Sequence, residues 1–204
     1  MIIVGLTGGI ASGKTFVSSY LKKNKIPVHE SDEVVRSIYK KQTKTFIACL
    51  FKIGFSNIIT SKKINKKKIR EEVFENKIKK NKLERYLHKE IEKNRKKFLG
   101  KNKNKEIVFL DIPLLFEKKL EKTCDLICST TAPLKTRKIR ALKRPGINIK
   151  ILNKILKNQT KESVRREKSH YIIDTSKTKK KTCLQVDYVI CDILKNRKEK
   201  KWEK

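Results

Sequence analysis

Four residues near the start of the chain have the types and the spacing that hold phosphate groups. The stretch "MIIVGLTGGIASGKTF" matches the pattern G-x-x-x-x-G-K-[ST] at Gly8, Gly13, Lys14 and Thr15. Glycines let backbone N–H groups turn onto phosphate oxygens, and a helix that starts here adds its N-terminal dipole. In this pattern Lys14 neutralises the β- and γ-phosphates, and the Thr15 hydroxyl ligates Mg²⁺. The pattern therefore predicts a site for a nucleoside triphosphate.

Acidic residues follow the next short apolar run. The segment "KIPVHESDEVVRSIY" places Glu30, Asp32 and Glu33 directly after residues 26–29, which we expect to form the second strand. A carboxylate at the carboxyl end of that strand could take the proton of an attacking hydroxyl or hold Mg²⁺ through water. Alternatively, Ser31 or Asp32 could be the N-cap of an ordinary helix. The spacing leaves both interpretations open.

Three arginines in "PLKTRKIRALKRPG" lie close together on one face of an expected helix. They are Arg137, Arg140 and Arg144. Guanidinium groups on a mobile lid could stabilise the charge of a phosphoryl group in transfer. In so basic a chain, the same spacing could equally be a solvated surface.

Short apolar runs predict buried strands of a parallel sheet. They lie at residues 2–6, 106–116, 125–130 and 187–194, and residues 171–176 are a further candidate. Helical segments separate these runs, for example at residues 12–24 and 133–144. Strands that alternate with helices predict an α/β fold with right-handed crossovers.

The length of the chain predicts a single domain over residues 1–204. We expect its sheet core to lie at about 1–35, 106–135 and 171–194. A charged helical insertion is expected at about 36–104, and a second helical segment at about 136–168. The chain should end in a frayed basic tail at about 195–204.

The chain is strongly basic, with 54 Lys and Arg against 21 Asp and Glu and a formal net charge of +33. Such a surface attracts polyanions. The basic residues are spread along the chain instead of forming one arm, and we therefore expect no specific nucleic-acid partner.

Nothing in the sequence resembles a secretory signal peptide, and no window approaches the ~18 apolar residues of a membrane span. We expect a cytoplasmic protein without a membrane partner, either a monomer or a small homo-oligomer. The five cysteines are odd in number and lack paired spacings, so the sequence predicts neither a disulfide framework nor a zinc site.

The phosphate-binding pattern alone does not say where the γ-phosphoryl group goes, since motors, GTPases and helicases share it. The chain has no N-K-x-D guanine motif, and its helical insertions leave no room for a helicase core. A small-molecule kinase is favoured, because such an enzyme needs an acceptor lobe and a mobile basic lid. The two helical segments could supply both.

Several segments together resemble the dephospho-coenzyme A kinase family of P-loop kinases, over most of the chain. "GLTGGIASGKT" is similar to the family's opening loop, and "LDIPLLFE" at residues 110–117 is similar to a segment that is not a general kinase feature. "ESDEVVR" and "LERYLHKEI" resemble its Asp-Ala-Asp and Leu-His-Pro segments. Arg140, Arg144 and Gln159 fall at its lid arginines and its late glutamine. The resemblance implies a three-layer α/β P-loop kinase fold with a parallel sheet core, a helical acceptor-binding insertion and a helical lid.

The resemblance also implies a reaction, the transfer of the ATP γ-phosphoryl group to the ribose 3′-hydroxyl of dephospho-coenzyme A in the last step of coenzyme A synthesis. The implied cofactors are ATP and Mg²⁺, with Thr15 on the metal. The implied catalytic residues are Lys14, Asp32 and Arg140, with Asp32 as the base or orienting carboxylate. The implied nucleotide-binding residues are Gly8, Gly9, Ala11, Ser12, Gly13, Lys14, Thr15, Phe16 and Arg144. The implied acceptor-binding residues are Asp32, His88, Pro113 and Glu117.

The chain departs from the family's pattern at several positions. Ala11 replaces a loop glycine, Glu30 replaces an aspartate, and Lys89 stands where a proline usually follows the histidine. "SHYIIDT" replaces the family's Ala-Asp and its final Asn, which changes His170 and Thr175. These changes leave an inactive relative that only binds ATP as one alternative.

Two further alternatives remain. A nucleoside-monophosphate kinase would share the loop, the lid and the fold, although "DIPLLFE" speaks against it. A nucleic-acid-binding ATPase would account for the charge of +33, and its affinity for nucleic acid would depend steeply on salt.

Overall fold

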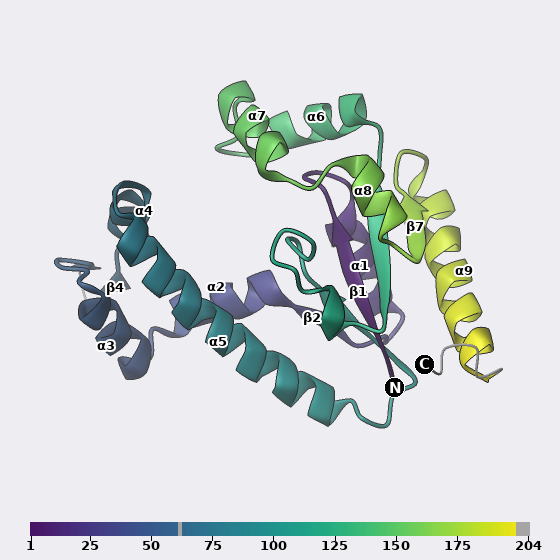
Figure 1. Cartoon of the computed structure of the whole chain (residues 1–204), viewed down its shortest axis with the longest axis horizontal. Helices are drawn as coiled ribbons and strands as arrows, with labels where there is room; N and C mark the ends of the chain where they lie inside the picture. The colour runs from purple at the N-terminus through teal and green to yellow at the C-terminus, as the bar shows by residue number, and fades with distance from the viewer. Residues whose placement is uncertain (61–62, 199–204) are drawn as a thin grey trace. The chain divides into compact units, whose positions relative to one another are not determined.

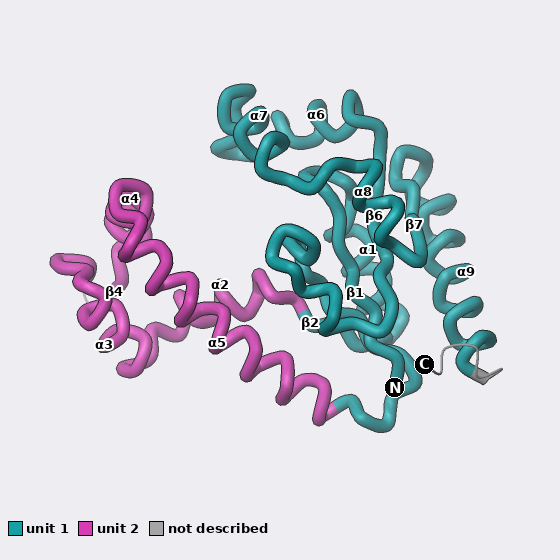
Figure 2. Tube along the Cα trace, in the orientation of Figure 1, with its two compact units in different colours: residues 1–29, 102–204 teal, residues 30–101 magenta. Residues whose placement is uncertain are grey.

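A computed structural model describes residues 1–60 and 63–198 of the chain. The chain forms two compact units (Figure 2). The first unit consists of Met1–His29 and Asn102–Lys204, and the second unit is Glu30–Lys101. Each unit has a hydrophobic core of its own.

A five-stranded sheet is the centre of the first unit (Figure 1). Its strands are β1 (Ile2–Gly8), β2 (Val28–Glu30), β5 (Ile107–Asp111), β6 (Leu126–Thr131) and β7 (Tyr171–Asp174). Their spatial order is β2-β5-β1-β6-β7. β1 pairs in parallel with β5 on one side and with β6 on the other, and β7 pairs in parallel with β6. The loop after β1 therefore leaves the middle of the sheet, at the edge where ligands bind in folds of this type.

Helices of the first unit lie between these strands in the chain, and α9 follows the last of them. In chain order they are α1 (Lys14–Lys23), the short 3-10 helix η1 (Glu121–Thr123), α6 (Leu134–Leu142), α7 (Ile149–Asn158), α8 (Glu162–Glu167) and α9 (Lys179–Lys198). α9 packs against both α1 and β7. The segment from α6 to α8 connects β6 to β7. It occupies nearly the same residues, 134–167, as the second helical segment that the sequence predicts at about 136–168.

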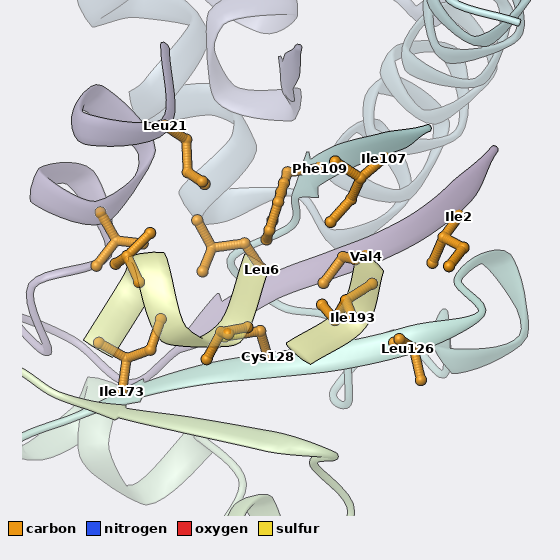
Figure 3. Close-up of a cluster of buried hydrophobic side chains, with 13 residues drawn as sticks. Ile2, Val4, Leu6, Leu21, Ile107, Phe109, Leu126, Cys128, Ile173 and Ile193 are labelled. Atoms are coloured by element: carbon orange, nitrogen blue, oxygen red, sulfur yellow. The ribbon is translucent and has the colours of Figure 1, made fainter. Parts of the chain in front are cut away.

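The apolar sequence of β1 is buried on both faces of the sheet, as a central parallel strand requires. Val4 and Leu6 have no exposed surface. Figure 3 shows them in one cluster with Phe109 of β5, Cys128 of β6 and Ile193 of α9. Burial of this apolar surface is the main favourable contribution to folding here. Close packing also fixes β1, and with it the point where the glycine-rich loop begins.

The second unit is mostly helical. Its elements are α2 (Ser31–Lys41), α3 (Lys44–Ile53), α4 (Lys66–Glu75) and α5 (Lys77–Lys101), with an antiparallel hairpin of β3 (Ile59–Thr60) and β4 (Lys63–Ile64). Phe46 is fully buried at the centre of this unit. Its ring meets the ring of Tyr39 edge-on at 5.1 Å and stacks on that of Tyr86 at 5.7 Å. Aromatic packing therefore gives this charged segment its core.

The strand expected over residues 187–194 is wrong, because these residues belong to α9. Val186, Val189 and Ile193 are buried at spacings of three and four residues. This spacing is the period of a helix, and it places the three side chains on one face. The run at residues 187–194 is therefore long enough for a strand, but its buried residues follow the period of a helix.

Two further boundaries differ from the prediction. The strand expected over residues 106–116 ends at Asp111, and turns follow it around Pro113, which has no N–H to donate. Residues 195–198 of the expected basic tail belong to α9, and the rest of that tail lies outside the described residues. No helix in the described part of the chain combines the length and the apolar character needed to cross a membrane.

Candidate active site

The loop at residues 8–13 joins the central strand to α1. The N–H of Ser12 donates to the carbonyl of Gly9 at 3.1 Å, which makes the loop turn tightly. Gly13 has φ 89°, in the left-handed region that favours glycine. Within the described residues, no side chain caps the start of α1 at Lys14. The helix therefore presents backbone N–H groups and the positive end of its dipole to an anion.

Close approach of other segments explains two of the loop's glycines. A Cβ atom on Gly8 would lie 2.2 Å from Oγ1 of Thr130. A Cβ atom on Gly9 would lie 2.4 Å from a guanidinium nitrogen of Arg137. Both distances are far below van der Waals contact. The loop can therefore lie this close to its neighbours only because these positions have no side chain.

Two departures from the family's pattern are accommodated by the fold. Ala11 has φ 57°, which costs an L-residue about 1–2 kcal/mol. Its methyl group is buried against Ala141 and Leu152, and this packing offsets part of the cost. Nδ1 of His170 accepts the N–H of Ile127 at 3.1 Å, so this histidine satisfies the backbone of β6.

Lys14 forms an ion pair with Asp111, the last residue of β5. The carboxylate of Asp111 is buried, and the ammonium group of Lys14 is largely buried. The register of the sheet sets this meeting, because Asp111 lies opposite Leu6 of β1, two residues before the loop begins. A carboxylate on the strand beside the loop is where P-loop proteins hold the metal ion of the nucleotide.

The other loop side chains have different surroundings. The hydroxyl of Ser12 is buried and lies 2.7 Å from that of Thr130. Ser12 therefore offers its backbone, not its hydroxyl, to a ligand. Thr15 is exposed in the first turn of α1, where its hydroxyl can meet a metal ion. Phe16 is half-buried in the same turn.

A cavity of about 290 Å³ lies beside the loop. Its lining combines loop residues, two predicted arginines and the segment after β7, namely Ala11, Gly13, Phe16, Arg140, Arg144, Thr175, Lys177, Lys179 and Thr182. Arg140 donates from Nη2 to the carbonyl of Thr175 at 2.8 Å and from Nη1 to its hydroxyl at 3.0 Å. The Thr175 hydroxyl in turn reaches the carbonyl of Ser12 at 2.8 Å. Arg140 is thus held in place at the cavity, whereas Arg144 is exposed.

Two residues predicted to bind the acceptor take part in contacts within the first unit. Oε1 of Glu117 accepts the N–H of Thr160 at 2.8 Å and lies 3.7 Å from Arg165. Pro113 is half-buried, and its carbonyl lies 3.4 Å from the Thr7 hydroxyl. Glu117 therefore supports the segment between α7 and α8.

Asp32 and His88 belong to the second unit. The N-cap of α2 is Glu30, which makes no side-chain capping bond. The alternative that Ser31 or Asp32 is the N-cap is therefore wrong. Asp32 is exposed in the first turn of α2, and His88 is exposed on α5. The carboxylate of Asp32 thus does not cap its helix, although its place in the first turn is favoured by the helix dipole.

Sequence reasoning missed two functional candidates. Asp111 ends the buried run "IVFLD", and an apolar strand that ends in a carboxylate beside a phosphate-binding loop was the signal that could have found it. Arg137 was interpreted only as one of three arginines on a helix face, but it is buried and contacts the loop. No signal in the sequence separates a buried arginine from its solvated neighbours on that helix.

Known proteins resemble this chain over nearly its whole length. A sequence model of the family described as dephospho-CoA kinase matches residues 2–181. The dephospho-CoA kinase of Bartonella quintana is 36% identical over 198 residues, covering 96% of this chain and 100% of that protein. That of Fusobacterium nucleatum is 35% identical over 180 residues, covering 86% and 90%. In structure, the dephospho-CoA kinase from Campylobacter jejuni has a TM-score of 0.71 at 22% identity, over 96% of this chain and 98% of that one.

The parallel sheet with its glycine loop on the central strand defines the class of P-loop kinases, and the α/β fold that the sequence predicts is confirmed. Within this class, the matches in sequence show that the chain belongs to the dephospho-CoA kinase family. It is therefore a kinase, and the activity of the family is the ATP-dependent phosphorylation of dephospho-CoA in coenzyme A biosynthesis. The matches give no support to the two alternative activities.

Proposed function

We propose that this chain transfers the γ-phosphoryl group of ATP to the ribose 3′-hydroxyl of dephospho-CoA, with Mg²⁺, through the residues assigned below. The observation that carries the proposal is the meeting of Lys14 and Asp111 at the uncapped start of α1, in a chain of this family. Phosphate groups and their metal ion need this combination of a cation, a carboxylate and backbone N–H groups.

The loop would bind the phosphates through its backbone and Lys14. The dipole of α1 and the ammonium group of Lys14 both favour negative charge at this point. Gly8, Gly9, Ala11, Ser12 and Gly13 would contribute through the shape of the backbone. Phe16 and Arg144 would contact the nucleotide from the cavity of about 290 Å³.

The donors near the loop fit Mg²⁺, which prefers oxygen ligands and is usually held by one or two carboxylates together with substrate phosphates. The hydroxyl of Thr15 and the carboxylate of Asp111 would hold it. When bound, the ion would draw charge from the transferred phosphoryl group. The ion pair with Lys14 would keep the carboxylate of Asp111 close to the metal ion, and the same ammonium group would neutralise phosphate.

Asp32 would orient the acceptor hydroxyl and take its proton. Support comes from its exposure and from its place two residues after β2, where it has no capping role. Arg140 would stabilise the phosphoryl group in transfer, because Thr175 already fixes its guanidinium group at the cavity. His88 and Pro113 would shape the acceptor site, and Glu117 would do so through Thr160.

A test is an ADP-release assay with ATP and Mg²⁺ in which each acceptor is offered separately: dephospho-CoA, a panel of nucleoside monophosphates, and DNA or RNA. We expect turnover with dephospho-CoA alone and a product that carries phosphate on the ribose 3′-oxygen, identified by NMR. Turnover with a monophosphate, or ATP hydrolysis stimulated by nucleic acid, would refute the proposed acceptor. The same assay tests our proposal that no nucleic acid is a partner, and cell fractionation tests the proposed cytoplasmic location.

A further inference from the structure

Both polar backbone groups of Ile10, a residue in the middle of the phosphate-binding loop, are held by side chains from the segment after β6. Nε of Arg137 donates to the carbonyl of Ile10 at 3.1 Å. The N–H of Ile10 donates to Oε1 of Gln159 at 3.0 Å. Arg137 belongs to α6, and Gln159 directly follows α7. Two separate elements thus hold one residue of the loop.

A carboxylate fixes the arginine of this pair. Nη1 of Arg137 donates to Oε2 of Glu162 at 3.1 Å, and Arg165 donates to the same oxygen at 3.0 Å. The other oxygen of Glu162 accepts the hydroxyl of Thr131, at the end of β6, at 2.5 Å. A buried guanidinium group needs such a partner. Arg137, Gln159 and Glu162 are here named the Ile10 clamp.

Arg137 and Arg140 lie on the same helix but in different surroundings. Arg140 lines the cavity of about 290 Å³ together with Ala11 and Gly13. Arg137 lines a larger cavity of about 450 Å³ with Gln159 and Glu162. Its side chain is buried and packs against Gly9. Arg137 therefore contacts the loop from outside, by way of the backbone, and does not face the cavity beside the phosphates.

We propose that Arg137 and Gln159 are positioning residues for the bound nucleotide. The Ile10 clamp fixes the first half of the loop, so that the N–H groups that follow keep the curvature that phosphate oxygens require. A loop that is already ordered binds its ligand without a further loss of conformational freedom. The inference rests on the proposed use of ATP by this loop, and it adds two residues that do not touch ATP.

Loss of either bond would leave a polar group of Ile10 without its partner and let the loop adopt other conformations. Hydrogen bonds that involve a charged group are among the stronger ones. We expect about tenfold weaker binding of the nucleotide when Arg137 is replaced by glutamine. Binding of the acceptor should change less than twofold, because the clamp holds only the phosphate-binding loop.

The experiment compares full-length wild type with Arg137→Gln, with Gln159→Met and with the double variant. Lys135→Gln is the matched control, because it removes one positive charge from an exposed position on the same helix. Isothermal titration calorimetry measures the Kd of a non-hydrolysable ATP analogue and, separately, of dephospho-CoA. Steady-state kinetics then give KM for each substrate, and thermal unfolding gives the stability of each variant.

The expected result is a higher Kd for the ATP analogue in both single variants, an unchanged Kd for dephospho-CoA, and no effect of Lys135→Gln. The double variant should weaken binding by less than the product of the two single effects, because both side chains hold one residue. Gln159 is only half-buried, so Gln159→Met keeps the test valid if Arg137→Gln fails to fold.

Two results would overturn the inference. One is an unchanged Kd for the ATP analogue in folded Gln159→Met, and the other is a parallel rise of Kd for both substrates that follows the loss of thermal stability. Failure of the proposed function looks different, because wild type itself would then fail to bind the ATP analogue, or would bind it without binding dephospho-CoA.

Discussion

Asp32 and Glu33 are neighbouring carboxylates in the first turn of α2, and both are exposed. We assign the base to Asp32, whereas Glu33 pairs with Arg36 at 2.8 Å. Replacing Asp32 by asparagine should lower kcat by about 10²–10⁴-fold, the usual contribution of a general base. The Kd of an ATP analogue, measured by calorimetry, should stay unchanged.

Glu33→Gln is the matched control for this prediction. It removes the same charge from the adjacent position, and an exposed ion pair contributes little to stability. Its kcat should therefore equal that of wild type. Full turnover by Asp32→Asn would contradict the assignment of Asp32 as the base. An equal loss of kcat in both variants would mean that the negative charge of this turn matters, and not one proton acceptor.

How well single residues could be predicted depended on their distance along the chain. Gly8, Gly13, Lys14 and Thr15 form one short motif, and the sequence alone points to their chemistry. Asp111 is 97 positions from Lys14 and reaches it only through the pairing of β1 with β5. Such a contact depends on which strands are neighbours in the sheet. The apolar runs predict where the strands are but not which of them pair.

At the scale of elements, α9 is held to the sheet partly by a tyrosine. The hydroxyl of Tyr171 in β7 donates to Asp192 of α9 at 2.6 Å. Removal of this hydroxyl in Tyr171→Phe should lower the free energy of unfolding by about 1–2 kcal/mol. Urea denaturation at pH 7 measures the change, with Tyr188→Phe as the control, because Tyr188 is exposed on the same helix. Equal stability of Tyr171→Phe and wild type would contradict the prediction.

The pH dependence of this contact gives a second measurement of the same variant. Burial, and then the hydrogen bond to Asp192, raise the pKa of Tyr171 above its ordinary value near 10. The folded tyrosine therefore stays protonated when the unfolded chain begins to lose its proton. The stabilising contribution is complete below about pH 10 and declines above it. The difference between wild type and Tyr171→Phe should stay constant up to about pH 10 and shrink as the pH rises above it.

Strands that coincide with a short continuous apolar run were predicted well. The runs that became β1, β5 and β6 are buried strands, the run that became β7 is a partly buried one, and only their ends differ from the prediction. α9 was misassigned over residues 187–194 because two of its core residues, Val189 and Ile193, lie in one short apolar run. The hairpin of β3 and β4 pairs two residues on each strand, which is too short for any period to appear in the sequence.

The charge of the whole molecule should make its stability depend on salt. The chain has 54 basic residues against 21 acidic ones, so repulsion among the cations exceeds the attraction that the carboxylates can supply. Exposed pairs such as Lys93 with Glu90 lose a little stability in salt, but the net repulsion is larger. Raising NaCl from about 10 mM to about 150 mM shortens the screening length from about 30 Å to about 8 Å.

We therefore expect the midpoint of thermal unfolding to rise over this range by about 2–4 °C for each 1 kcal/mol of relieved repulsion. Differential scanning calorimetry measures it, and an uncharged osmolyte at equal osmolality serves as the control. A midpoint that falls with salt would mean that attraction within ion pairs, and not the net repulsion among cations, dominates the electrostatic free energy.

The close contacts of the phosphate-binding loop also restrict how this sequence can evolve. Gly8, Gly9 and Gly13 each lie against a side chain from a distant segment, namely Thr130, Arg137 and Thr175. A side chain at any of these three positions would collide with that partner, so the partner would have to move or become smaller first. The order of mutations therefore matters. Neutral drift at these three pairs therefore has few permitted paths, and at Gly13 the positive φ makes a side chain unfavourable whatever its partner.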